Sequence, residues 1–453
     1  MEMQDLTDKR RKAIFVNLTL TCVMASLLAT ALNLALSPII SSFGISAGMG
    51  QWLISGYALV LAVAMPLTAY LVSRFPTKRI YLTALGLFIA GLLVCALAPG
   101  FPSMMAGRVM QACGNGMIAG TTQTTLLSIF PKSERGRVMG WFGLSVNLAP
   151  VAAPPLAGLL VDALGWRSIF WCALCVCCVS FALACTVMRN VLQTVPKRFD
   201  VLSFALSTLA FGGLTLGVGN ISSFGLAAVP VFIPLAVGIL SAVMFAKRQF
   251  ASEEPLLKLT LLKTPAFAIS VLATVVLYFL MMGSNAILPL YLQSGLGHTA
   301  FVSSLVLLPG VICMAVVSPY AGSVLDRFGM KRLACVATAV LLAASALLCF
   351  LGQTWSLWLI ALANALRFAA IGSLTMPFAT WGNNNIETRD IAHGSAIQTS
   401  LRNVAGALGV AVFVGLSQIG LQSAGPAFGM RLSFAVMTAL SAILLAFSLR
   451  LKD

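Results

Sequence analysis

Two stretches of the chain read almost alike: residues 69–79 are AYLVSRFPTKR, and residues 322–332 are GSVLDRFGMKR. Each has a small residue, three variable residues, Ser or Asp, then Arg-Phe, and each ends on Lys-Arg after two further residues. Each follows a long apolar segment, near residues 51–72 and 302–324. A basic loop that recurs between apolar segments indicates an internal repeat in a chain that crosses a membrane many times.

A second pair of similar stretches lies inside apolar segments. Arg108 precedes Gly114 near residues 103–129, and Arg367 precedes Gly372 near residues 356–379. In both pairs the two copies are eight apolar segments apart. The pattern therefore predicts two related halves of six segments, with two extra segments between them.

The composition supports a membrane protein. Hydrophobic residues make up 59% and charged residues 9%, and the mean hydropathy is +0.98. A soluble domain, with about 25% charged residues, needs far more polar cover, and a disordered chain is less apolar. The apolar segments are too long for a transmembrane barrel, whose strands are about ten residues. The predicted fold class is an all-α polytopic membrane protein.

Fourteen apolar segments separated by polar breaks are long enough to cross a bilayer. They lie near residues 14–40, 51–72, 80–99, 103–129, 138–162, 168–188, 201–220, 226–246, 266–291, 302–324, 332–352, 356–379, 394–418 and 430–449. This order predicts three parts: an N-terminal six-helix bundle at residues 1–190, a two-helix insert with linkers at 191–262, and a C-terminal six-helix bundle at 263–453.

The basic residues predict the orientation. Most of the 28 Lys and Arg residues fall on one side of the predicted membrane, the side that also holds both termini. By the positive-inside rule that side is the cytoplasm. The net charge of +16 is then an orientation signal beside anionic lipid and does not indicate nucleic-acid binding. We expect a multi-pass protein of the bacterial cytoplasmic membrane, with no cleaved signal peptide.

Further motifs occur in a consistent order along nearly the whole chain. Arg108, Gln111 and Gly114 fit R-x-x-Q-x-x-G, and residues 149–158 are rich in Pro, Ala and Gly. Other stretches that fit lie at 51–57, 165–171, 288–297 and 394–403. With the repeated loop, this set resembles the major facilitator superfamily, specifically its fourteen-span drug:proton antiporter branch. The resemblance implies a major facilitator fold with 14 transmembrane helices, arranged 6 + 2 + 6.

The resemblance implies roles for the repeated loop and for the fifth span. The loop residues would form a conformational latch at the cytoplasmic ends of the bundles, and they are Ser73, Arg74, Asp326 and Arg327. The first copy departs from the pattern at three positions (Ala69, Ser73 and Pro76), which predicts a weaker latch. Pro150, Pro154 and Gly158 would make the fifth span a gating helix. The alternatives are residues that only set topology and cap helices, and ordinary close packing of the fifth span.

Arginine inside hydrocarbon is costly and normally faces a cavity or a partner. Arg108, Arg367 and Arg402 all fall within predicted spans. Each is interpreted either as a cavity-facing residue or as a packing residue bonded to backbone carbonyls. The expected substrate cavity lies between the bundles, with candidates Asn33, Tyr57, Arg108, Gln111, Asn115, Asn285, Tyr291, Arg367, Gln398, Arg402 and Asn403.

The first span departs from the resemblance at one position. The branch usually carries an acid there, and this chain has Leu28. No carboxylate is predicted near the middle of the membrane, since Asp162 lies near the outer end of its span. A group that exchanges a proton for a cationic substrate must titrate, which arginine does not do. The usual proton coupling is therefore in doubt.

Taken together, these patterns predict a secondary active transporter that works by alternating access and exports small amphipathic molecules. The alternative is a transporter or flippase of an anionic or zwitterionic lipid-like metabolite. An enzyme is disfavoured because the chain has two distant histidines, His298 and His393, and no membrane carboxylate. We expect no cofactor or metal. We expect the protein to lie in a lipid bilayer and to act as a monomer, and the sequence leaves open whether protons are transported.

Overall fold

The computed structural model describes residues 7–192, 199–224, 228–252, 255–350 and 356–451. The described residues form helices and short connections. The first six helices are α1 (Asp8–Phe43), α2 (Ala47–Arg74), α3 (Thr77–Ala96), α4 (Phe101–Ile129), α5 (Arg135–Leu164) and α6 (Ser168–Val187). Then follow α7 (Val201–Phe224), α8 (Val229–Ala251), α9 (Pro265–Leu290), α10 (Ala300–Cys349), α11 (Leu357–Asn384), α12 (Ile391–Ala424) and α13 (Pro426–Leu449).

Helix α10 contains two of the predicted spans. Gly329 has φ 80° and ψ 174° inside it, so α10 is two helical segments that meet at a kink. Only glycine adopts this backbone conformation without a steric cost. The sequence predicts a polar loop between these spans, and the structure makes the turn at this single glycine. Counted this way, the described residues form fourteen helical segments.

Eleven of the described helices are long and apolar enough to cross a membrane. Helix α10 is counted once among them, and α4 and α5 are not included. Helix α4 is less apolar because it carries Arg108, Gln111 and Asn115 along its length. The fold is therefore all-helical with many membrane-length helices, and the count of fourteen spans stays a prediction.

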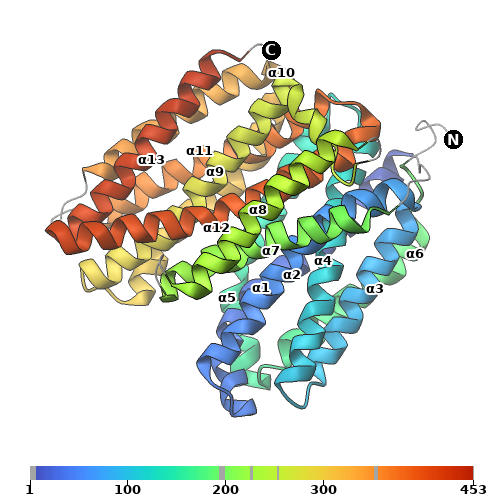
Figure 1. The fold of residues 1–453 in the computed structure, drawn as a ribbon, viewed down its shortest axis with the longest axis horizontal. Coiled ribbons are helices and arrows are strands. Elements are labelled where there is room, and N and C mark those ends of the chain that lie inside the picture. The colour runs from blue at the N-terminus through green and yellow to red at the C-terminus, as the bar shows by residue number, and fades with distance from the viewer. Residues whose placement is uncertain (1–6, 193–198, 225–227, 253–254, 351–355, 452–453) are drawn as a thin grey trace.

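The buried apolar residues form two main clusters. One draws mainly on α1–α6, with Leu18, Phe88 and Phe170 fully buried. The other draws on α9–α13, with Leu277 and Phe434 fully buried. In Figure 1, α1–α6 extend toward the bottom of the view and α9–α13 toward the left, while both chain ends lie at the upper right. The two bundles therefore meet at the end that holds the termini, here called the termini end, and diverge toward the opposite, far end.

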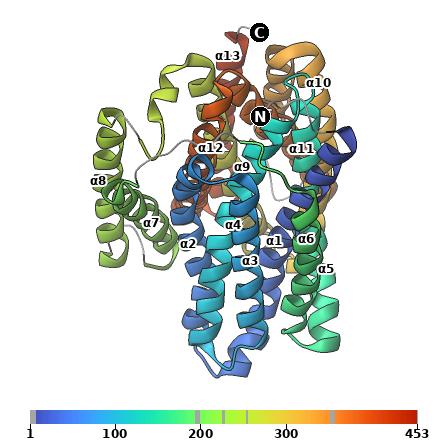
Figure 2. The same ribbon diagram turned by 90° about the vertical axis from the view of Figure 1, so that its right-hand side faces the viewer.

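Helices α7 and α8 pack against each other, and α7 also contacts α2 and α12. Figure 2 shows the pair as a separate layer beside the bundles. Asp200 begins α7: its carboxylate accepts hydrogen bonds from the Ser203 amide at 3.1 Å and from Arg248 of α8 at 2.9 and 3.0 Å. The Arg248 hydrogen bond, helped by Ser203, lowers the pKa of Asp200 to about 2. This ion pair joins α7 and α8 at the termini end.

Candidate transport site and inter-bundle latch

Arg108 is the centre of a polar cluster inside the first bundle. It is 2% exposed. Its Nε donates to the Leu53 carbonyl at 3.1 Å, its Nη1 donates to Gln111 Oε1 at 2.8 Å, and its guanidinium lies 4.0 Å from the Tyr57 ring centroid. Gln111 in turn donates to the Gly91 carbonyl at 3.1 Å. These contacts tie α4 to α2 and α3, and they match the packing alternative for Arg108.

Asn115 connects this cluster to a less buried position. Its amide nitrogen donates to the Tyr57 hydroxyl at 2.8 Å, and the Asn115 side chain is only partly buried. The structure thus brings Tyr57, Arg108, Gln111 and Asn115 together. Asn33 of α1 and Asn285 of α9 lie apart from the cluster and are exposed.

Arg367 is packed inside the second bundle. It is fully buried, and its Nη2 donates to the Leu280 carbonyl at 2.8 Å and contacts Met437 Sδ at 3.5 Å. Its guanidinium lies 5.5 Å from the Phe434 ring centroid. Its Nε and Nη1 have no hydrogen-bond partner among the described residues. Arg367 therefore joins α9, α11 and α13, but with poorer hydrogen bonding than its counterpart Arg108.

The predicted residues of α12 divide by environment. Gln398 is buried, and its amide donates to Ser270 Oγ at 2.9 Å and accepts from Asn383 at 2.8 Å. Arg402 is partly buried, with its guanidinium 4.4 Å from the Tyr278 ring centroid. Asn403 is also partly buried. Tyr291 is buried in the π-helical turn Tyr291–Gly295 that follows α9.

Asp326 connects the two bundles. Its Oδ1 accepts a hydrogen bond from the Gly136 amide at 2.9 Å, and its Oδ2 accepts one from the Arg137 amide at 2.7 Å. These amides belong to the first turn of α5, whose free N–H groups and dipole favour a negative charge. The second loop copy therefore contacts the opposite bundle, as a latch requires.

Ser73 of the first loop copy makes no contact comparable to that of Asp326 in the described part of the chain, although Val72 beside it packs with Ala392 of α12. The Ser73 hydroxyl donates to the Tyr70 carbonyl of its own helix at 2.9 Å. Arg74 is exposed, as is Arg327 of the second copy. A serine in place of the acid cannot offer a charged acceptor to a helix terminus. The difference between the two copies matches the departure seen in the sequence.

Helices α5 and α10 cross in backbone contact beside Asp326. A Cβ added at Gly322 would lie 2.0 Å from the Gly136 carbonyl oxygen, and one added at Gly140 would lie 2.6 Å from the Ser318 carbonyl oxygen. The sequence reasoning missed Gly136 and Gly140, although their small-x-x-x-small spacing marks a close helix crossing. The closest contact between the bundles therefore depends on glycine.

The Pro/Gly run of α5 lies farther along the same helix. Pro150 is exposed, and the side chain of Pro154 lies outside the described residues. A Cβ added at Gly158 would meet no atom within 4 Å. Gly158 is therefore not needed for close approach of α5 to another helix.

A second set of inter-bundle contacts also escaped the sequence reasoning. Lys132 Nζ donates to the Asn384 carbonyl at 2.9 Å, and Arg135 Nη1 donates to Asn384 Oδ1 at 2.9 Å. From the sequence, Lys132 and Arg135 contribute only to the orientation signal. No pattern in the sequence points to Asn384, because the contact joins residues about 250 positions apart. Together with Asp326, these contacts hold the termini end closed.

The chain matches the family model described as Major Facilitator Superfamily over residues 18–410. The lincomycin resistance protein LmrB of Bacillus subtilis is 34% identical over 90% of this chain and 85% of its own length. The MFS-type transporter YcnB of the same organism is 33% identical over 97% and 95%. A multidrug resistance protein B homolog of Mycobacterium tuberculosis is 28% identical over 86% and 74%.

Solved structures share the fold at low sequence identity. The human organic anion transporter MFSD10 has a TM-score of 0.68 at 15% identity, covering 98% of this chain and all of that one. The proton:xylose symporter XylE has a TM-score of 0.67 at 14% identity, covering 98% and 97%. The family model, the relatives and the fold agree, and the chain belongs to the Major Facilitator Superfamily of membrane transporters.

Proposed function

We propose that this chain is a fourteen-span drug exporter of the bacterial cytoplasmic membrane that works by alternating access. The observation that carries the proposal is the Asp326 contact with the first turn of α5, which joins the two bundles at one end together with the Lys132 and Arg135 bonds to Asn384. In Figure 1 the bundles diverge at the other end. A two-bundle molecule whose bundles are joined at one end and diverge at the other has the form that one state of an alternating-access transporter takes.

The proposed division of the chain is a six-helix bundle at residues 1–190, an insert at 191–262 and a six-helix bundle at 263–453. The two buried apolar clusters support it, since each draws mainly on one half. The placement of the basic residues supports cytoplasmic termini. Nothing in the proposed mechanism requires more than one copy of the chain.

The proposed substrates are small amphipathic molecules. Relatives that this chain matches over 85% and 74% of their own length are named for lincomycin resistance and multidrug resistance, which supports export of such compounds. Of the proposed cavity residues, Asn33, Asn285, Asn115, Arg402 and Asn403 are exposed or partly buried and so can reach a bound molecule. Arg402 and its Tyr278 partner would also suit an anionic, lipid-like substrate, which is the second candidate.

We further propose that transport does not use a carboxylate in the membrane core. The carboxylates among the described residues lie at helix ends, in connections or beside the Gly329 kink. Leu28, at the position where the resemblance expects an acid, is 3% exposed and lines an apolar pocket between α1, α5 and α6. An ionised side chain there would be costly.

Flux into proteoliposomes tests the proposal. Lincomycin and a panel of cationic, neutral and anionic amphipathic compounds are offered with and without a pH gradient. The proposal predicts saturable flux of at least one compound at a rate that the gradient does not change. Exchange of a lipophilic dication for protons would contradict the coupling proposal, and no flux for any compound would contradict export. Competition by an anionic lipid at the transport site would favour the second candidate.

A further inference from the structure

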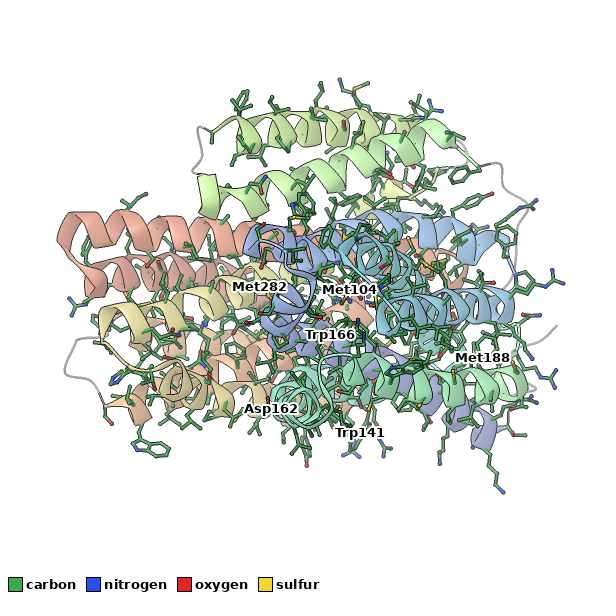
Figure 3. All side chains as sticks on the ribbon, turned by 90° about the horizontal axis from the view of Figure 1, so that it is seen from below. Met104, Trp141, Asp162, Trp166, Met188 and Met282 are labelled. Carbon is green, nitrogen blue, oxygen red and sulfur yellow. The ribbon has the colours of Figure 1, made fainter. Side chains whose placement is uncertain are left out.

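A groove lies on the outer surface where α5 and α10 cross. Its cavity volume is about 600 Å³, and its walls come from both bundles. Its charged lining residues are Glu134, Arg137, Asp326 and Arg327, and its aromatic and apolar lining includes Trp141, Val316 and Tyr320. Trp141 lies at the edge of the molecule on the side opposite α7 and α8 (Figure 3). The groove therefore opens outward and not into the space between the bundles.

The walls of the groove carry two cations, Arg137 and Arg327, and two carboxylates, Glu134 and Asp326, and no ion pair joins a cation to a carboxylate among these described residues. The guanidinium groups of Arg137 and Arg327 are exposed, and neither makes an ion pair or a side-chain hydrogen bond with another described residue. Both oxygens of Asp326 already accept backbone amides of α5. The two segments beside the groove, residues 131–137 and 326–332, contain six basic and two acidic residues. The groove is thus suited to an anion.

An apolar track leads from the groove along the membrane-facing side of α10. It consists of residues spaced three or four apart and 38–69% exposed: Leu305, Leu308, Ile312, Val316 and Tyr320. Trp141 and Leu148 continue the apolar surface on α5, at 48% and 44% exposed. Exposed Trp and Tyr side chains beside arginine are typical of the headgroup level of a bilayer, with apolar residues toward the hydrocarbon. A charged groove followed by an apolar track matches the polar headgroup and the acyl chain of a lipid.

We propose that this groove binds an anionic phospholipid of the leaflet at the termini end. The phosphodiester lies between Arg137 and Arg327, and an acyl chain follows the apolar track on α10. This inference takes one premise from the proposed function, namely that the termini end lies at a membrane surface. Because Arg137 belongs to one bundle and Arg327 to the other, the bound headgroup joins them beside Asp326. The equivalent seam between α2 and α12 is covered by α7, which contacts both helices.

Native mass spectrometry of the full chain in neutral detergent tests the site. Phosphatidylglycerol is titrated against phosphatidylcholine and against glycerol 3-phosphate. The proposal predicts that phosphatidylglycerol binds most tightly. The double variant Arg137→Gln, Arg327→Gln loses roughly thirtyfold in affinity, from the attraction that two basic residues supply near a membrane surface. The matched control, Arg74→Gln with Arg79→Gln in the first loop copy, keeps wild-type affinity.

Three results would overturn the proposal: equal binding of phosphatidylcholine, equal affinity of both double variants, or full displacement by glycerol 3-phosphate. If the double variant fails to fold, brominated phosphatidylglycerol replaces it as the probe. The brominated lipid must quench wild-type tryptophan fluorescence more than that of Trp141→Phe, and equal quenching contradicts the site. None of these measurements requires transport. A result that contradicts lipid binding can therefore be distinguished from a result that contradicts export.

Discussion

At the scale of single residues, the Asp326 carboxylate joins the bundles through two hydrogen bonds from backbone amides of α5. It accepts two amides that lie about 190 positions earlier in the chain. Such charge-assisted bonds contribute about 1.5–3 kcal/mol each, more than an ordinary hydrogen bond. Asp326 is therefore placed to bias the equilibrium between the closed and the open termini end.

Asp326→Ala is expected to expose the first turn of α5. The Gly136 and Arg137 amides lose their acceptor, so their hydrogen exchange is expected to be about tenfold faster or more. Hydrogen–deuterium exchange on a peptide covering residues 133–141 measures this. Ser73→Ala is the control, since Ser73 bonds only to its own helix. Unchanged exchange at α5 in Asp326→Ala would show that the latch does not hold this turn.

The two buried arginines are expected to respond differently to replacement. Arg108→Met leaves Gln111 Oε1 without its donor and loses the bond to Leu53, so the melting temperature is expected to fall. Arg367→Met removes a buried charge with a single backbone bond, so the melting temperature is expected to stay or rise. Thermal unfolding in detergent compares the two variants. A larger loss for Arg367→Met would contradict this interpretation.

The candidate site could be predicted only in part at this scale. The sequence indicates Asp326, because a charged residue in a repeated loop stands out. It does not indicate the partner, which is a pair of backbone amides from a distant helix. Arg108 and Arg367 occupy equivalent positions in the repeat and both avoid lipid. Sequence cannot distinguish a cavity from a packed interior for such residues, because both environments require an inward-facing side chain.

At the scale of elements, α5 and α10 form the closest contact between the bundles. Glycine allows it, because a side chain at Gly322 or Gly136 would overlap the facing backbone. The same helix α5 carries Gly158, where a side chain would meet open space. One helix thus offers both a position that cannot accept a methyl group and a matched position that can.

Gly136→Ala is expected to destabilise the closed arrangement by about 1–3 kcal/mol, the usual cost of overpacking, because the added methyl group would overlap the facing Gly322 carbonyl oxygen. Gly158→Ala is expected to be neutral or slightly stabilising, because alanine is the better helix former. Thermal unfolding of the two variants, measured side by side, checks the difference. Equal melting temperatures would mean that α5 and α10 are not in backbone contact.

The Asp200–Arg248 pair predicts a pH dependence of the α7–α8 contact. The pKa of Asp200 is about 2 in the folded chain, below its ordinary value of 3.8. Because the folded value is the lower one, the pair stabilises the fold above about pH 4 and loses this effect as the pH falls toward 2. The melting temperatures of wild type and Asp200→Asn should differ at neutral pH and converge near pH 2. A constant difference would contradict the pair.

At the scale of the whole molecule, hydropathy and the repeated loops predict an all-helical membrane protein, and the fold confirms this. Helix length and apolarity suffice for that prediction, because a bilayer requires both. The break between the tenth and eleventh predicted spans differs from the polar loop that the sequence predicts. It is a single kink at Gly329 and not a loop, since glycine alone can take that backbone turn. The way in which the bundles meet depends on contacts between distant residues and is not visible in the sequence.

The central claim is that the two bundles open alternately at the termini end and at the far end. Spin-label distances in proteoliposomes test it, with one pair at Arg74 and Glu387 and another at Leu164 and Trp358, all exposed. Added substrate is predicted to lengthen the first distance and shorten the second in the same sample. Two distances that stay constant, or that change in the same direction, while flux is measured would contradict alternating access in this chain.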